Sequence, residues 1–265
     1  MRKVALGVEY DGTEFFGWQA QREQRSVQST LTEAIGQVAD ERVVVHGAGR
    51  TDTGVHALQQ VVHFEASAER TPRQWVLGVN SNLPADVRVQ WAREMPDDFD
   101  ARRSATARHY RYLVLESDVD SPLLRRRAWR VRGPLDCAAM TRAALALLGE
   151  NDFSAFRAAG CQSRTPMRRL MAAGVERAGR IVALDFVANA FLHHMVRNLV
   201  GVLVEIGTGR APAAWASEVL AAKDRRLAAV TAPANGLTLI DVAYPQRFEI
   251  PPAAGRDAWR RDPAA

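Results

Sequence analysis

The chain has 265 residues, which is long enough for two fused halves of ordinary domain size. Its 47% hydrophobic and 25% charged content is that of a globular protein, and its net charge of +5 favours a polyanionic partner. It has no run of about 18 uncharged apolar residues, no apolar core of a signal peptide, and only two cysteines, Cys137 and Cys161, in no metal-like or redox-like pair. We therefore expect a soluble cytoplasmic protein with reduced thiols.

The first hundred residues alternate strand and helix signals. Lys3 to Tyr10 is an alternating, valine-rich and leucine-rich strand that ends at a turn, Asp11-Gly12. Ser26 is suited to cap a helix with its apolar residues on one face. The remaining elements expected here are strands near 42–46, 60–65 and 87–93, and a short helix near 72–80. This order predicts an α+β fold.

A second set of elements follows residue 105. Asp136 is suited to cap a helix that Gly149 stops, and Ala178-Gly179 is the turn of a predicted hairpin. The other elements expected here are strands at 109–115, 168–177, 180–187 and 237–242, and helices at 191–206 and 213–222. We therefore predict an N-terminal half over 1–104, a C-terminal half over 105–246, and a loosely held tail over 247–265.

A glycine-punctuated segment, Gly47-Ala-Gly-Arg-Thr-Asp-Thr-Gly-Val-His56, lies between two predicted strands. Its glycines permit backbone angles that other residues resist, and they let a bulky partner approach closely. A loop fixed at both ends presents its side chains in a set geometry. Asp52 is therefore a candidate nucleophile, with Arg50 two residues before it.

The predicted helix that begins at Phe191 carries Arg197 on a side away from its apolar stripe, together with His193. Such an arginine is expensive to bury unpaired, so it either pairs with a carboxylate or lies on the wet face of the helix. Neighbouring helical residues point about 100° apart, so we expect that His193 and His194 do not share a metal ion. We expect no metal site elsewhere, and core or surface positions for His56 and His63.

Nine arginines lie between residues 102 and 132, against three acidic residues, and His109, Tyr110, Tyr112 and Trp129 are interleaved with them. Guanidinium groups pair with phosphates, and flat rings stack on unpaired bases, so this basic segment is suited to RNA. A solvated surface is the alternative. Because lysine occurs only at positions 3 and 223, genome composition is a further explanation for the arginines.

Other site classes fit the glycine-punctuated segment less well. It lacks the third glycine of a dinucleotide fingerprint, and no phosphate-loop motif is present. Asp52-Thr53-Gly54 is the tripeptide of aspartic proteases, whose paired carboxylates share a proton. A preceding cation, Arg50, opposes the raised pKa that this sharing requires.

Seven separated blocks, in order along the chain, resemble the bacterial tRNA pseudouridine synthase A family. They are Ala5 to Gly12, Phe16-Gly-Trp-Gln19, Gly47 to His56, Ser104 to Tyr112, Gly149 to Phe153, Cys161-Gln-Ser-Arg164 and Phe191 to Asn198. The resemblance implies isomerisation of uridine to pseudouridine at positions 38 to 40, in the anticodon arm of tRNA, without metal or organic cofactor. It also implies a homodimer.

By the same resemblance, Asp52 is the catalytic nucleophile and Arg197 is the arginine paired with it. Tyr110 stacks on the target base and is a candidate for the proton relay; half-buried packing in a sheet is its alternative role. Arg50 displaces the target base, and Leu237 lines the pocket.

The expected architecture is two ferredoxin-like α+β halves, joined into one extended, mainly antiparallel sheet with helices on one face. The rival hypothesis is a non-catalytic RNA-binding protein that uses the same basic segment without chemistry.

Overall fold

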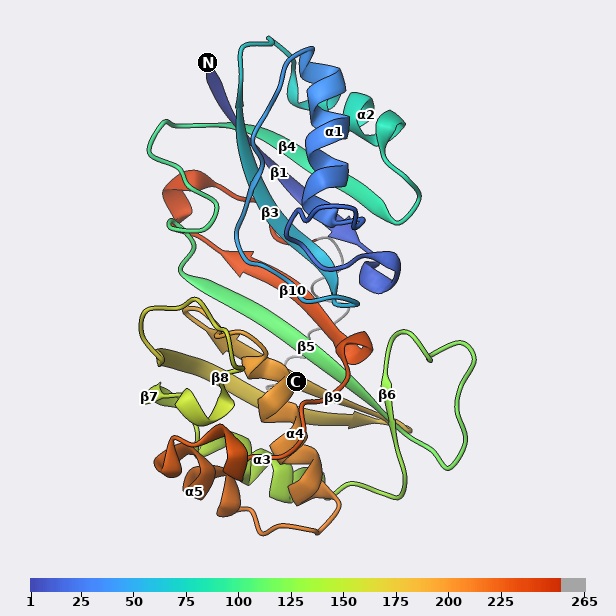
Figure 1. The fold of residues 1–265 in the computed structure, drawn as a ribbon, viewed down its shortest axis with the longest axis vertical. Coiled ribbons are helices and arrows are strands. Elements are labelled where there is room, and N and C mark those ends of the chain that lie inside the picture. Colours follow the sequence, from blue (N-terminus) through green and yellow to red (C-terminus); the bar gives the residue numbers. More distant parts are fainter. Residues whose placement is uncertain (254–265) are drawn as a thin grey trace. The chain divides into compact units, whose positions relative to one another are not determined.

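A computed structural model describes residues 1–253 of the chain (Figure 1). The chain divides into two compact units. Unit 1 comprises Met1–Thr106 and the chain from Leu239 onward, and unit 2 comprises Ala107–Thr238. The first break lies two residues from the position expected from the sequence, whereas the last strand is assigned mainly to unit 1 rather than to the second half.

Unit 1 is built on antiparallel strands in the order β4-β1-β3, with β10 beside β3. The helices α1 and α2 pack together, and α2 lies against β4 (Figure 1). Both helices begin with a capping box, formed by Ser26 and by Thr71. The elements are β1 (Arg2–Tyr10), α1 (Val27–Ala39), β2 (His46–Gly47), β3 (His56–Ala66), α2 (Pro72–Asn82), β4 (Val87–Met95) and β10 (Leu237–Ala243).

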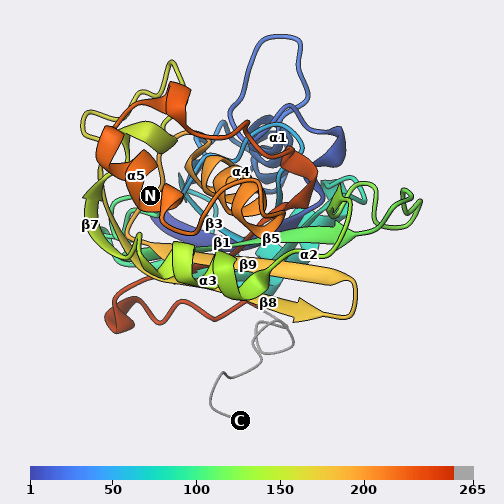
Figure 2. The same cartoon turned by 90° about the horizontal axis from the view of Figure 1, so that it is seen from below.

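Unit 2 has the antiparallel strand order β5-β9-β8-β7, and a short strand, β6, pairs in parallel with β5. α3 packs on β8 and on α4 (Figure 2). Alternate residues of β5 and β9 are buried, so one face of these strands belongs to the core. The elements are β5 (Ala107–Glu116), β6 (Trp129–Val131), α3 (Cys137–Leu145), β7 (Gly149–Asp152), β8 (Met167–Ala178), β9 (Ile181–Ala188), α4 (Met195–Gly207) and α5 (Trp215–Ala222).

The predicted fold class is confirmed, because the described chain forms a large, mostly antiparallel sheet with helices in an α+β arrangement. No helix within residues 1–253 is long and apolar enough to cross a membrane. Part of the predicted tail is not loose, since Phe248 is buried and its ring packs edge-on against Phe99. Residues 254–265 of that tail lie outside the described part of the chain.

Two predicted elements are wrong in part. The strand expected over 42–46 is reduced to β2, and the carbonyl of Val45 accepts a hydrogen bond from the Gln28 side chain instead of one from a neighbouring strand. The helix expected from residue 191 begins at Met195. His194 has a φ of +60°, in the left-handed region, so the backbone cannot continue the helix in the N-terminal direction.

Candidate active site

Asp52 lies in unit 1, on the loop between β2 and β3, and its side chain is half-buried. The backbone on both sides of it is fixed. The carbonyl of Thr51 accepts a hydrogen bond from the N–H of Trp18 (3.0 Å), and the carbonyl of Asp52 accepts one from the N–H of Val55 (3.1 Å). Gly54 supplies the positive φ, +79°, that closes this turn. The loop therefore holds the backbone of Asp52 in a defined position.

The loop also packs closely against the segment that follows β1, with glycines at the points of contact. A Cβ on Gly17 would lie 2.8 Å from the Thr51 carbonyl oxygen, and Gly17 has a φ of +83°. A Cβ on Gly12 would overlap the Val55 carbonyl, and one on Gly47 would lie 2.5 Å from the Trp18 ring. These approaches are closer than any other residue permits, so backbone packing sets the position of the loop.

Buried polar side chains complete the support of the loop. The Tyr10 hydroxyl hydrogen-bonds the Thr51 hydroxyl at 2.8 Å, and burial raises the pKa of Tyr10 to about 12. Gln60 bonds both backbone groups of Gly49 through its side-chain amide. His56 accepts a hydrogen bond from the Gly12 N–H at 3.1 Å, which is a core role of the kind expected for it. Tyr10 and Gln60 are supports that the sequence analysis missed.

Three other predicted site residues belong to unit 2: Tyr110 on β5, Arg197 in α4 and Leu237 at the start of β10. Tyr110 on β5 is 7% exposed, and its ring meets that of Phe191 edge-on, with centroids 5.2 Å apart. Its ring is thus partly packed in the sheet, as the alternative role of this tyrosine requires. Because this packing holds the Tyr110 ring in place, the ring is also suited to stack on a base.

Arg197 lies in the first turn of α4 and is tied to the segment 228–236, which we call the strap. Its Nε donates to the Ala232 carbonyl at 2.8 Å, and its own carbonyl accepts from the Ala232 N–H at 3.1 Å. The Tyr112 hydroxyl donates to the next carbonyl, that of Pro233, at 2.8 Å. Burial raises the pKa of Tyr112, and the nearby Arg197 charge opposes this shift. Both ends of the Arg197 residue are therefore bonded to the strap.

The strap is anchored to α4 by a buried polar network that the sequence analysis also missed. Asn198 is fully buried, and its amide nitrogen donates to the Phe156 carbonyl at 2.7 Å. The amide oxygen accepts from Thr231 at 2.7 Å and from Arg225 at 3.0 Å. The sequence feature that could have indicated this network is an asparagine directly after Arg197 in a mostly apolar helix.

Leu237 follows the strap at the start of β10 and is buried. Gly236 before it packs against the Tyr112 ring, which a Cβ would approach to 2.7 Å. In unit 2, Arg197 and Tyr112 therefore both bond the strap, and Leu237 directly follows it. Asp52 and Arg50 belong to unit 1, and the Arg50 side chain is exposed.

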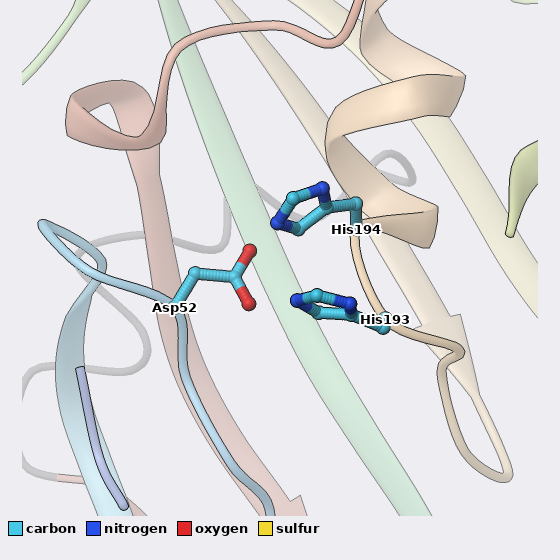
Figure 3. Close-up of side chains that lie close together, drawn as sticks. All are labelled: Asp52, His193 and His194. Atoms are coloured by element: carbon cyan, nitrogen blue, oxygen red, sulfur yellow. The ribbon is translucent and has the colours of Figure 1, made fainter. Parts of the chain in front are cut away.

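The expectation that His193 and His194 diverge rests on a helix that does not begin there. Their ring centroids are 4.0 Å apart, with the ring planes tilted by 44° (Figure 3). The 100° separation of neighbouring helical residues therefore gives no reason against a shared ion. Figure 3 also shows the Asp52 carboxylate projecting from its own loop.

Some residues of the basic segment form hydrogen bonds within the fold, and others are exposed. Arg111 and His109 on β5 both bond Asp185 on β9, at 2.8–2.9 Å and 2.7 Å. Burial acts to raise the pKa of Asp185, but its bonds with His109 and Arg111 outweigh burial and lower that pKa. Arg108 is buried and donates to the Asn189 carbonyl. The exposed arginines of the segment lie at positions 102, 103, 125, 126, 127 and 132.

The chain is matched by the family model described as tRNA pseudouridine synthase, over residues 7–102 and 143–245. Three relatives named tRNA pseudouridine synthase A cover nearly all of it. The one from Enterobacter sp. (strain 638) is 53% identical over 95% of this chain and 93% of its own. Those from Cronobacter sakazakii and Escherichia coli (strain SMS-3-5 / SECEC) are 55% and 54% identical, each over 94% of this chain and 92% of its own.

These matches define the class of the protein as a pseudouridine synthase. The chain belongs to the tRNA pseudouridine synthase family, and the resemblance to the bacterial tRNA pseudouridine synthase A family is confirmed. The protein is therefore an enzyme, and the protease and non-catalytic hypotheses are set aside.

Proposed function

We propose that this enzyme isomerises uridine to pseudouridine at positions 38 to 40 in the anticodon stem-loop of tRNA, with Asp52 as the nucleophile. The family membership supports the reaction, and the placement of half-buried Asp52 on a loop with a fixed backbone is the observation that carries the choice of nucleophile. A reactive group on a rigid loop loses little freedom when the substrate arrives.

The reaction breaks the bond between N1 of uracil and C1′ of ribose, and then joins C5 of uracil to C1′. The C5 proton is lost and N1 gains a proton, so no atom or electron is supplied from outside. The carboxylate of Asp52 either adds to C6 of the ring or assists departure of uracil at C1′. Both routes need the base to turn while it is held, which requires a nucleotide extruded from its stack. The proposed reaction needs neither a metal nor an organic cofactor.

The other site residues have proposed roles that follow their chemistry. Arg197 supplies a positive charge for the carboxylate, and the bond from its Nε to the Ala232 carbonyl orients the guanidinium. Tyr110 stacks on the uracil and relays a proton. Arg50 is exposed, as a side chain that displaces a base must be. Leu237 supplies an apolar wall.

The exposed arginines of the basic segment are proposed to bind the phosphates of tRNA, which makes binding sensitive to salt. Homodimerisation and a cytoplasmic location are also proposals. The first follows from the family resemblance, and the second from the composition and the two cysteines. Light scattering at micromolar concentration tests the first, because a monomeric mass would contradict it.

Tritium release from tRNA labelled at C5 of uracil measures the reaction directly. We expect Asp52→Asn to reduce the rate by at least about 10³-fold while tRNA binding persists, because the amide keeps the shape but removes the nucleophile. Thr53→Ala, at the exposed neighbouring residue, is the matched control and retains activity. A normal rate for Asp52→Asn contradicts the assignment of the nucleophile. Tritium release while uridine persists at positions 38 to 40 in sequenced tRNA contradicts the proposed target.

A further inference from the structure

A pocket of about 290 Å³ lies in unit 2 beside β6. It is distinct from the residues assigned to the reaction above. Its size is near the lower end of the roughly 300–1,000 Å³ range of small-molecule sites, which suits one nucleotide base rather than a helical stem. The residues that line it are Leu115, Asp120, Ser121, Leu124, Arg125, Ala128, Trp129, Arg130, Pro233 and Asn235.

The walls of this pocket are preformed. One wall is a turn in which the N–H groups of Arg127 and Ala128 both donate to the Leu124 carbonyl at 2.9 Å. The Asn235 side chain fastens this turn to the strap, because its amide nitrogen donates to the carbonyls of Arg125 (2.7 Å) and Ala128 (3.2 Å). A ligand therefore meets an ordered site and need not order the loop on binding.

The lining carries the groups that a single nucleotide needs. Trp129 is fixed on β6, which pairs with β5, and its ring meets the Tyr112 ring edge-on with centroids 6.4 Å apart. Leu124 supplies a second apolar surface. Trp129 is half-exposed, and such a ring is a stacking surface for any base.

The charge around the pocket suits a phosphate. The Arg130 Nε donates to Asp120 at 2.5 Å, so the acidic residue at the rim is already paired. The side chain of Arg125 is exposed and lines the pocket. The pocket therefore has an exposed guanidinium group beside a stacking ring, a combination that proteins use for unpaired RNA.

We propose that this pocket binds one unpaired nucleotide of the tRNA substrate, other than the target uridine, with its base against Trp129 and Leu124 and its phosphate at Arg125. The inference rests on the proposed function for the identity of the RNA. It assigns the pocket a role in holding the substrate, without selecting a particular base, since stacking tolerates every base.

The pocket shares the strap with the candidate active site. Pro233 lines the pocket and accepts the Tyr112 hydroxyl, and Asn235 lies two residues before Leu237. The same segment also bonds Arg197 through Ala232. The pocket and Arg197 therefore contact one short segment that is already ordered before a ligand binds.

The matched pair of variants Leu124→Trp and Leu123→Trp tests the proposal. Leu124 lines the pocket, whereas its neighbour Leu123 is 91% exposed and is not part of the lining. We expect Leu124→Trp to raise KM for full-length tRNA about tenfold, as loss of one stacked base predicts, with kcat retained. Leu123→Trp should match the wild type, and thermal melting of both proteins checks that they fold.

Two further measurements keep the proposal falsifiable if Leu124→Trp folds poorly. Arg125→Gln should lower the slope of log Kd against log salt concentration by the contribution of about one phosphate contact. A photoreactive benzoylphenylalanine at position 124 should crosslink to one unpaired nucleotide outside positions 38 to 40, mapped by primer extension.

Equal KM values for the two tryptophan variants, an unchanged salt slope, or crosslinks confined to paired stems would overturn the pocket assignment. Failure of the proposed function is recognised separately, because the wild type would then leave positions 38 to 40 unmodified whatever the crosslinks show.

Discussion

The Asp52 loop of unit 1 and the strap of unit 2 hold their functional side chains by different means. The loop is held chiefly by backbone hydrogen bonds and by glycines in contact with carbonyls, as at Gly17 and Thr51. The strap is held chiefly by side chains, in the network of Asn198, Thr231 and Arg225. The first arrangement tolerates almost no added atom, whereas the second depends on particular polar groups. The two regions should therefore fail in different ways when they are altered.

Among variants that keep Asp52, the largest combined loss of kcat and stability is expected from Gly17→Ala, because the added methyl group meets the Thr51 carbonyl at 2.8 Å and the residue has a φ of +83°. Displacement of the loop by a fraction of an ångström should reduce kcat about 10²-fold. Tritium release and thermal melting measure the two consequences.

Gly133→Ala is the control for this change, since Gly133 has a similar φ of +74° but nothing within 4 Å of the added Cβ. It should cost about 1 kcal/mol of stability and leave kcat unaffected. If both variants lose kcat equally, close packing is not what holds the Asp52 loop.

Arg197→Ala should reduce kcat by about 10²-fold, because it removes a fixed charge from the reaction. The change in Tm should be small by comparison. Arg197→Lys keeps the charge but loses the planar fork and the Nε bond to Ala232, so it should lie between the alanine variant and the wild type. An alanine variant that mainly unfolds, with activity lost in proportion, would indicate a structural role instead.

Acid should destabilise unit 1 through His63. Burial lowers the pKa of His63 to about 4, and its Nδ1 accepts the Ala101 N–H at 3.1 Å. The histidine of the unfolded chain takes up a proton near pH 6.5. The contribution of neutral His63 to the stability of the folded protein is therefore complete above that pH, and it is lost as the pH falls from 6.5 towards 4. We expect a loss of about 2 kcal/mol, after allowance for partial contact with solvent.

Denaturant unfolding at pH 7 and pH 4.5 measures this loss, with His63→Gln as the comparison. The glutamine variant should show less pH dependence over this range. Because the His46 ring stacks on His63 at 5.0 Å and begins β2, protonation should loosen the strand that leads into the Asp52 loop. Identical pH dependence of the two proteins would show that His63 is not responsible.

The smallest effect is expected from Thr231→Val, which keeps the shape but removes the hydroxyl that bonds Asn198. Stability should fall by about 1–2 kcal/mol, and kcat should fall several-fold as the strap loosens around Arg197. Thr231→Ser retains the hydroxyl and should restore both quantities. A loss of stability with kcat unchanged would separate the strap from the reaction.

Local signals in the sequence predicted much of the fold. Ser26 and Asp136 cap helices as expected, because a cap needs only its own neighbours. The start of α4 was misplaced, since the apolar periodicity runs on through the left-handed backbone at His194. The valines before β2 were assigned to a strand because their composition does not reveal that Gln28 takes the Val45 carbonyl.

The candidate site shows the same division between local and distant information. The glycine spacing pointed to the Asp52 loop, but its supports at Tyr10 and Gly17 are distant in the sequence and make contacts that no local pattern encodes. The strap was not predicted for the same reason, because Asn198 and Thr231 meet only after the chain has folded.

Thr53 lies at the tip of a turn whose flanking peptides are fixed on both sides, and its own side chain is exposed. It therefore offers an attachment point for a spectroscopic reporter. A small fluorophore on a cysteine placed there would sit one residue from the Asp52 carboxylate without entering the packed glycine contacts, and it would signal the arrival and departure of tRNA in real time.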